Sequence, residues 1–163
     1  MRSVLPIAQK GYRRMQSQES HINTETARIE TDERHVVVRF GGETIAESRR
    51  AIRVTETGHP PVFYIVPEDV RVELLEAIEQ QTECPHKGIA HYYNITLDDG
   101  RRAEAAAWCY PEPKADFEAI QHGIAFYPAR VDATVDGHQV GPEEDPYYGG
   151  WIIDEQSPDE NAP

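Results

Sequence analysis

The sequence predicts a mainly β domain of antiparallel sheets with one or two short helices. Short runs of apolar and β-branched residues recur along the chain, and clusters of Gly, Pro and polar residues separate them. A strong hairpin signal occupies residues 89–109. In only two short stretches do the apolar residues recur at the spacing of a helix. Many strands with few helices are typical of an antiparallel β domain.

The size and charge of the chain predict one domain with two polar ends. The chain has 163 residues and a formal net charge of −13. Residues 1–14 carry four basic residues and no acid, whereas residues 141–163 carry seven acids and no Lys or Arg. We expect a flexible segment over residues 1–20, the β domain over 21–140 and an acidic tail over 141–163. Residues 147–153 form an apolar island that we expect to dock on the domain or on a second copy, in a monomer or a homodimer.

Composition also argues against several function classes. The negative charge disfavours binding to a nucleic-acid polymer, which needs basic surface to displace counterions. No apolar run approaches the ~18 residues of a membrane span, and the N-terminal apolar patch is too short for a signal peptide. We therefore expect a cytoplasmic protein without a membrane partner. Two cysteines at nonstandard spacing predict no metal site, and no motif indicates a cofactor.

Five strands are expected in the first part of the chain, over residues 27–31, 35–40, 43–47, 51–56 and 62–66. The β-branched run 36–38 favours a pleated, half-buried surface. Gly41 and Gly42 interrupt the pattern, and the turn at residues 58–61 contains two prolines.

Pro67 marks a change of period. Proline at a first helical position followed by two acids is a helix start signal. Val70, Leu74 and Ile78 then follow at helical spacing, which predicts a helix to about residue 78 and a polar loop over 79–83. A second short helix is expected over 115–122, ended by Gly123, followed by strands over 124–127 and 131–135.

The central hairpin is predicted to join strands 89–97 and 101–109 through a loop at Asp98, Asp99 and Gly100. A type I turn closed by glycine in the left-handed region suits this loop. A two-residue loop is the alternative, and it would place Trp108 on the other face from Tyr92. The expected pairs are Leu97 with Arg101, Tyr93 with Ala105, and Ile89 with Cys109.

In the three-residue register, one face of the hairpin combines large aromatic rings with hydrogen-bonding groups, as many ligand sites do. The opposite face carries alanines and is expected to be core. One interpretation of the mixed face is a pocket for a small molecule, and the other is a second small core with polar tips in water. The candidate ligand-binding residues are Tyr92, Asn94, Glu104, Trp108 and Tyr110.

A thiol enzyme is the alternative function. Cys84 would be the nucleophile, with His86 or Lys87 lowering its pKa, because a neighbouring cation favours the thiolate. Cys84 and Lys87 are thus the candidate catalytic residues. The competing interpretation is an inert, half-buried cysteine where a strand begins.

Several blocks of sequence together resemble one protein family. They are RFGGETIAES (39–48), TGHPPVFYIVPEDVR (57–71), CPHKGIAHYYNI (84–95), AAWCYPEP (106–113) and IAFYPARVD (124–132). The chain resembles the family known as domain of unknown function 427, also labelled nucleotidyltransferase-like, over residues 20–153. The resemblance implies a β-tent fold, shared with methionine sulfoxide reductase B and the thalidomide-binding domain of cereblon. Those relatives carry a zinc held by cysteine pairs, and this chain lacks such a pair.

The family label adds nucleotide binding or nucleotidyl transfer as a further alternative. Arg49, Arg50 and Arg53 with Lys87 are the candidate phosphate ligands, and the competing interpretation is an edge strand kept soluble by charge. The transfer reaction itself needs carboxylates that hold magnesium and a phosphate cradle. The glycine pair at residues 41–42 lacks the lysine and hydroxyl of a phosphate loop.

Overall fold

The computed structural model describes residues 27–145 and 148–156. The predicted flexible segment 1–20, part of the acidic tail (157–163) and Tyr147 of the apolar island lie outside these residues. In the part of the chain that is described, no helix has the length and hydrophobicity needed to cross a bilayer.

The described chain forms three antiparallel sheets and a few short 3₁₀ helices, which confirms the predicted mainly β fold class of antiparallel sheets. A three-stranded sheet has the order β1-β4-β5, formed by β1 (Arg28–Asp32), β4 (Ala51–Thr55) and β5 (Val62–Tyr64). A five-stranded sheet has the order β12-β11-β10-β2-β3. Its strands are β2 (Val36–Phe40), β3 (Glu43–Ser48), β10 (Asp132–Val135), β11 (His138–Pro142) and β12 (Trp151–Ile153). The strands predicted near the N-terminus therefore form close to their expected bounds.

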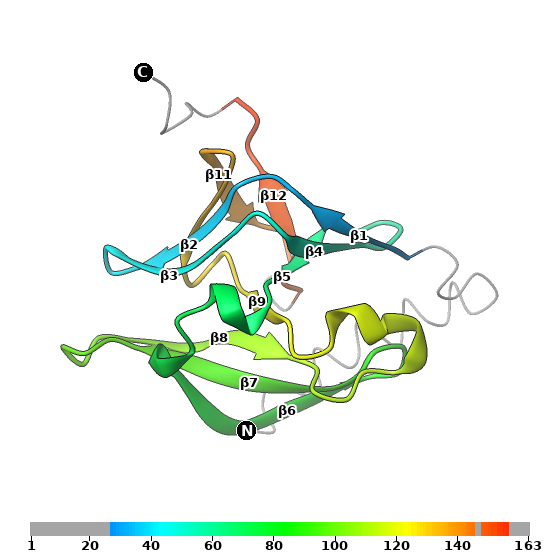
Figure 1. Ribbon diagram of the computed structural model, residues 1–163, viewed down its shortest axis with the longest axis horizontal. Helices are drawn as coiled ribbons and strands as arrows, with labels where there is room; N and C mark the ends of the chain where they lie inside the picture. The colour runs from blue at the N-terminus through cyan, green and yellow to red at the C-terminus, as the bar shows by residue number, and fades with distance from the viewer. Residues whose placement is uncertain (1–26, 146–147, 157–163) are drawn as a thin grey trace.

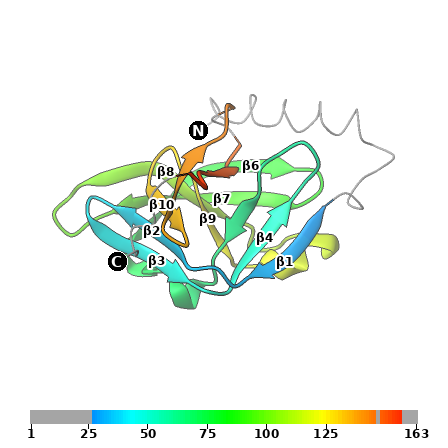
Figure 2. The same cartoon turned by 90° about the horizontal axis from the view of Figure 1, so that it is seen from above.

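The third sheet has the order β6-β7-β8-β9, with β6 (Leu75–Cys84), β7 (Gly88–Thr96), β8 (Arg102–Cys109) and β9 (Ile124–Phe126). The chain passes directly from β1 to β2 and from β3 to β4, so the other two sheets make one bent layer opposite this one (Figures 1 and 2). The layers meet where Ile65, just after β5, pairs with Ile124 of β9 through two hydrogen bonds of 2.8 Å.

The helix predicted from Pro67 to Ile78 is wrong. The chain forms two single-turn 3₁₀ helices, η2 (Pro67–Asp69) and η3 (Val72–Leu74), and then enters the long strand β6. The residues expected to form a polar loop, 79–83, belong to this strand. Pairing with β7 outweighs the local helical spacing, since tertiary context routinely overrides a short periodic pattern. The second predicted helix forms as η4 (Ala115–Ile120).

The central hairpin turns as predicted, but its register changes halfway along. Gly100 has a φ of 94°, and the Leu97 N–H donates to the Arg101 carbonyl at 2.8 Å. A bulge in β8 then inserts two residues opposite Asn94. The predicted pairs Tyr93 with Ala105 and Ile89 with Cys109 are therefore wrong. The observed pairs beyond the bulge are Tyr93 with Ala107, Tyr92 with Trp108, and His91 with Cys109.

Because the bulge inserts an even number of residues, Tyr92 and Trp108 still share a face, as the three-residue loop requires. The last three residues of β8 alternate between two buried clusters. Ala107 and Cys109 belong to the main core, and Trp108 belongs to a second cluster. The second cluster also contains Tyr64, Cys84, Ala90, Tyr92, Tyr110, Phe117, Ile120, Ala125 and Tyr127. A cavity lies beside this aromatic cluster.

Candidate functional site

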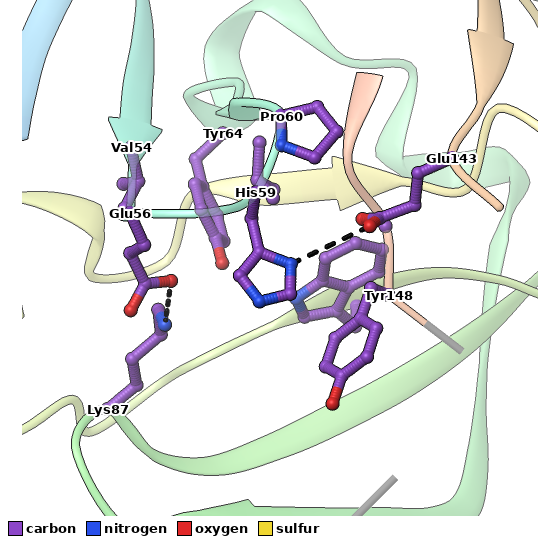
Figure 3. A pocket seen from close by; sticks show the side chains of 11 residues that line it. Val54, Glu56, His59, Pro60, Tyr64, Lys87, Glu143 and Tyr148 are labelled. Atoms are coloured by element: carbon purple, nitrogen blue, oxygen red, sulfur yellow. Dashed lines mark hydrogen bonds and ion pairs between the residues drawn. The ribbon is translucent and has the colours of Figure 1, made fainter. Parts of the chain in front are cut away.

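The candidate site is a cavity of about 30 Å³ beside the Trp108 ring. Its walls come from β4, β5 and β8, from the turns that follow β4 and β6, and from the segment that leads into β12. These elements are distant in sequence, and their side chains come together around the cavity (Figure 3). The lining residues are Val54, Glu56, His59, Pro60, Val62, Tyr64, Lys87, Trp108, Glu143, Tyr148 and Gly149.

A buried ion pair forms one wall. The Lys87 Nζ donates to Glu56 Oε1 at 2.7 Å and lies 4.9 Å from the centre of the Phe117 ring. The Lys87 residue is only 3% exposed. The turn after β6 places it there, because Gly88 has a φ of 117° and pairs with Cys84 to close the hairpin. A lysine so buried needs its carboxylate partner, since an unpaired buried charge is costly.

His59 and Glu143 form a second polar pair. The Nδ1 of His59 lies 3.6 Å from a Glu143 carboxylate oxygen, and the Tyr148 ring lies 5.0 Å from the imidazole. The other Glu143 oxygen accepts the Gly150 N–H at 3.0 Å, which fixes the carboxylate. Figure 3 shows the Lys87–Glu56 pair to the left of His59 and Glu143 to its right. The cavity is thus bordered by two carboxylates, one in the Lys87–Glu56 ion pair and one in the polar His59–Glu143 pair.

Aromatic rings hold Trp108 in place. Its ring is 4.5 Å from Tyr127 and 6.3 Å from Tyr64, the latter in an edge-to-face arrangement that aromatic pairs favour. Gly149 lies directly against the indole, so that any Cβ at this position would overlap the ring. Burial raises the pKa of the Tyr64 and Tyr127 hydroxyls, which therefore remain neutral. The indole is a fixed, flat wall of the cavity.

The sequence pattern of the family described as domain of unknown function DUF427 matches residues 28–137. The chain belongs to this family. No curated protein matches the chain. In this DUF427 member, Glu56, His59, Lys87 and Trp108 lie within the matched residues, whereas Glu143 and Tyr148 come from the segment beyond them.

Of the residues that the sequence predicted to bind a ligand, Trp108 reaches the cavity. Tyr92 and Tyr110 are buried in the second cluster, and the Tyr92 hydroxyl is 2.9 Å from Thr82 Oγ1. Asn94 Oδ1 accepts the Ala105 N–H at 2.8 Å and so stabilises the bulge. Glu104 is exposed on the bulge. The structure therefore does not bring these residues into one pocket, because the bulge and the packing of the rings give them separate roles.

The two candidate catalytic residues have different surroundings. Lys87 lines the cavity, but Cys84 lies in the second cluster and is 2% exposed. Burial raises the pKa of the Cys84 thiol, and the nearby Lys87 ammonium offsets this only in part. Burial likewise raises the pKa of Cys109. A raised pKa disfavours the thiolate, which is the nucleophilic form, at both cysteines.

Carboxylates pair with two of the candidate phosphate ligands. Arg50 donates to both oxygens of Asp69 at 3.0 Å. Arg53 donates to Asp32 at 2.5 Å and to Glu30 at 2.7 Å, and Arg49 is exposed. These arginines do not converge with Lys87 at the cavity. Among the described residues, no group of three His, Cys, Asp or Glu side chains is placed to hold a metal ion.

Sequence reasoning missed five of the polar and aromatic residues of the cavity: Glu56, His59, Tyr64, Glu143 and Tyr148. His59 was assigned only to a proline-containing turn, which is correct for its backbone, since its N–H donates to the Glu56 carbonyl at 3.0 Å. No local pattern in the sequence marks these residues as a site, because they are brought together by the contact of this turn with the apolar island near the C-terminus. Trp151 N–H donates to the Pro61 carbonyl at 2.8 Å, which draws Tyr148 towards His59.

Proposed function

We propose that this chain is a small-molecule-binding domain whose ligand occupies the cavity beside Trp108. The observation that carries the proposal is the composition of the cavity wall. Apolar and aromatic side chains form most of it, and a few polar groups converge on it from Lys87, Glu56, His59 and Glu143. Ligand sites in proteins typically combine these features.

Size and charge narrow the ligand class. One water needs about 10–15 Å³ of cavity volume, so the volume of about 30 Å³ accepts a group of only a few heavy atoms. A planar group would stack on Trp108 or Tyr148. A cationic group would be favoured by these rings and by the Glu56 and Glu143 carboxylates, with each ring contributing about 0.5–2 kcal/mol. We therefore propose a small planar or cationic ligand, or one such group of a larger molecule.

Two other functions receive less support. A thiol reaction needs an accessible thiolate, whereas Cys84 is buried and its pKa is raised. A nucleotide site needs basic groups that converge on phosphate, whereas Arg50 and Arg53 are engaged by acids on the three-stranded sheet and at η2. The cavity at Trp108 remains the site with the broadest set of suitable groups.

The test compares two glycine-to-alanine variants, one at the cavity and one away from it. Gly149→Ala should push a methyl group into the indole wall and abolish binding, whereas Gly141→Ala in β11 meets nothing within 4 Å and should leave it unchanged. Native mass spectrometry of the purified wild-type chain should first identify a co-purified ligand. Trp fluorescence in a Trp151→Phe background then reports on Trp108 alone, because the chain has two tryptophans. Equal binding by both glycine variants would refute the proposed site.

A further inference from the structure

One side chain of the cavity has a reactive group that binding alone does not require. The chain has three lysines, Lys10, Lys87 and Lys114. Lys10 lies outside the described residues, and Lys114 is exposed. Of the two lysines that the structure describes, Lys87 is the buried one. It lines the cavity, and its Nζ donates a 2.7 Å hydrogen bond to Glu56.

We propose that Lys87 forms an imine with small aldehydes or ketones that enter the cavity. The inference rests on the proposed binding site and adds a covalent step to it. Amines of this kind react with carbonyl carbons when a neighbouring group accepts the ammonium proton and the site excludes bulk water. Glu56 is positioned to accept that proton, and Val54, Val62 and Trp108 provide apolar walls for the carbon atoms of the ligand.

The atoms balance without any further reactant. The Lys87 ammonium passes a proton to Glu56, and the nitrogen lone pair forms a bond to the carbonyl carbon. The carbonyl oxygen takes the electron pair of the broken π bond and receives the proton back from Glu56, which gives a carbinolamine. This intermediate expels its hydroxyl, which leaves as water with the second nitrogen proton relayed through Glu56. The net change is ammonium plus carbonyl compound to iminium plus water.

The surroundings suit the product as well as the starting amine. The iminium carries the same single positive charge as the ammonium, so both the Glu56 pair and the contact with the Phe117 ring are kept. The cavity volume of about 30 Å³ restricts the carbonyl compound to a few heavy atoms. Acetaldehyde is a probe of suitable size, and a bulky aromatic aldehyde should be excluded.

The experiment traps the imine by reduction. The folded wild-type chain is incubated with acetaldehyde and cyanoborohydride, and peptide mapping by mass spectrometry follows the N-ethyl adduct at Lys87 and at Lys114. Lys114 is an internal control, because it is exposed, its Nζ donates to the Pro85 carbonyl at 2.7 Å, and no carboxylate of the described residues forms an ion pair with it. We expect Lys87 to be labelled faster by about tenfold or more, within what a positioned proton-transfer group supplies. Labelling of Lys87 at or below the rate of Lys114 would overturn the inference.

Two variants distinguish the reactivity of the Lys87 amine from the access of the aldehyde to the cavity. Glu56→Gln should slow labelling of Lys87 by about 10²-fold and leave Lys114 unchanged, because it removes the proton acceptor. Gly149→Ala keeps the Lys87–Glu56 pair but narrows the cavity, and it should also slow Lys87 alone. Unchanged labelling of Lys87 in both variants would overturn the inference. If Trp108 fluorescence responds to the ligand while Lys87 is not labelled, the covalent step fails and the binding site stands; if neither occurs, both fail.

Discussion

Replacing Asp32 by Asn tests how strongly one buried carboxylate stabilises the contact between β1, the turn that follows it and β4. Asp32 is a buried carboxylate, 4% exposed, at the end of β1. One oxygen accepts the Arg34 backbone N–H at 3.0 Å, and the other accepts Arg34 Nη2 at 2.7 Å and Arg53 Nη1 at 2.5 Å. Two guanidinium groups and a backbone amide thus compensate one charge.

The contribution of Asp32 to the free energy of unfolding follows from the pKa of its carboxyl group. The Arg34 hydrogen bond, with the Arg34 amide and Arg53, lowers the pKa of Asp32 from 3.8 to about 2, against the opposing effect of burial. By linkage this lowering corresponds to about 2 kcal/mol, and screening at the 36% exposed Arg34 side chain reduces it to about 1–2 kcal/mol. Because the pKa is lower in the folded state, the stabilisation is fully present above about pH 5 and is lost as the pH falls through about 2.

Urea unfolding at several pH values measures this contribution. Asp32→Asn should lower the free energy of unfolding by about 1–2 kcal/mol near neutral pH, and the difference from wild type should largely vanish near pH 2. Asp99→Asn is a matched control, because Asp99 accepts the backbone N–H and Nε of Arg101 in the same i to i+2 arrangement but on the exposed hairpin loop. Its effect should be small at every pH. Equal effects of the two substitutions, or an Asp32 effect that persists in acid, would refute the reasoning.

Three further predictions concern buried groups. Asn94→Ala removes the acceptor of the Ala105 N–H in the bulge and should lower the free energy of unfolding by about 1–3 kcal/mol; urea curves identical to wild type would contradict this. Trp151→Phe removes the indole N–H that donates to the Phe126 carbonyl at 3.0 Å. Calorimetry should show that the free energy of unfolding falls by about 1–3 kcal/mol. Cys84 should react with Ellman's reagent much more slowly in the folded chain than after unfolding, since burial raises its pKa; equal rates would show an accessible thiolate.

Local turn chemistry made the central hairpin predictable. Two aspartates followed by Gly100 specify a loop whose last residue has a positive φ, and no distant contact is needed to form it. The register beyond Ile95 was not predictable in the same way. Ala105 has a φ of 49° and depends on the side chain of Asn94 for its N–H partner, and a run of alanines gives no sign of such a bulge.

The error at β6 has a different cause. Val70, Leu74 and Ile78 have helical spacing, but the strand carries a register shift between Ala77 and Gln81 that disturbs simple alternation. A bulged strand therefore loses the period of two on which sequence-based assignment depends. Only the pairing with β7 reveals its conformation.

The candidate site was predictable in part. Trp108 and Lys87 were singled out from their local patterns, and both line the cavity. Their partners Glu56, His59 and Glu143 are brought there by sheet topology, which joins segments far apart in the chain. A single sequence gives the chemistry of each side chain but not the pairings across sheets.

The position of Trp151 has a practical consequence for how this family is delimited. Its side chain is 1% exposed and packs 4.8 Å from Phe63, although it lies well beyond residue 137, where the family match ends. A fragment cut at that boundary would leave a hole the size of an indole, at a cost of about 3–5 kcal/mol, a large share of the ~5–15 kcal/mol that holds a typical domain together. We therefore expect a fragment that ends at residue 137 to be clearly less stable than the chain that includes Trp151.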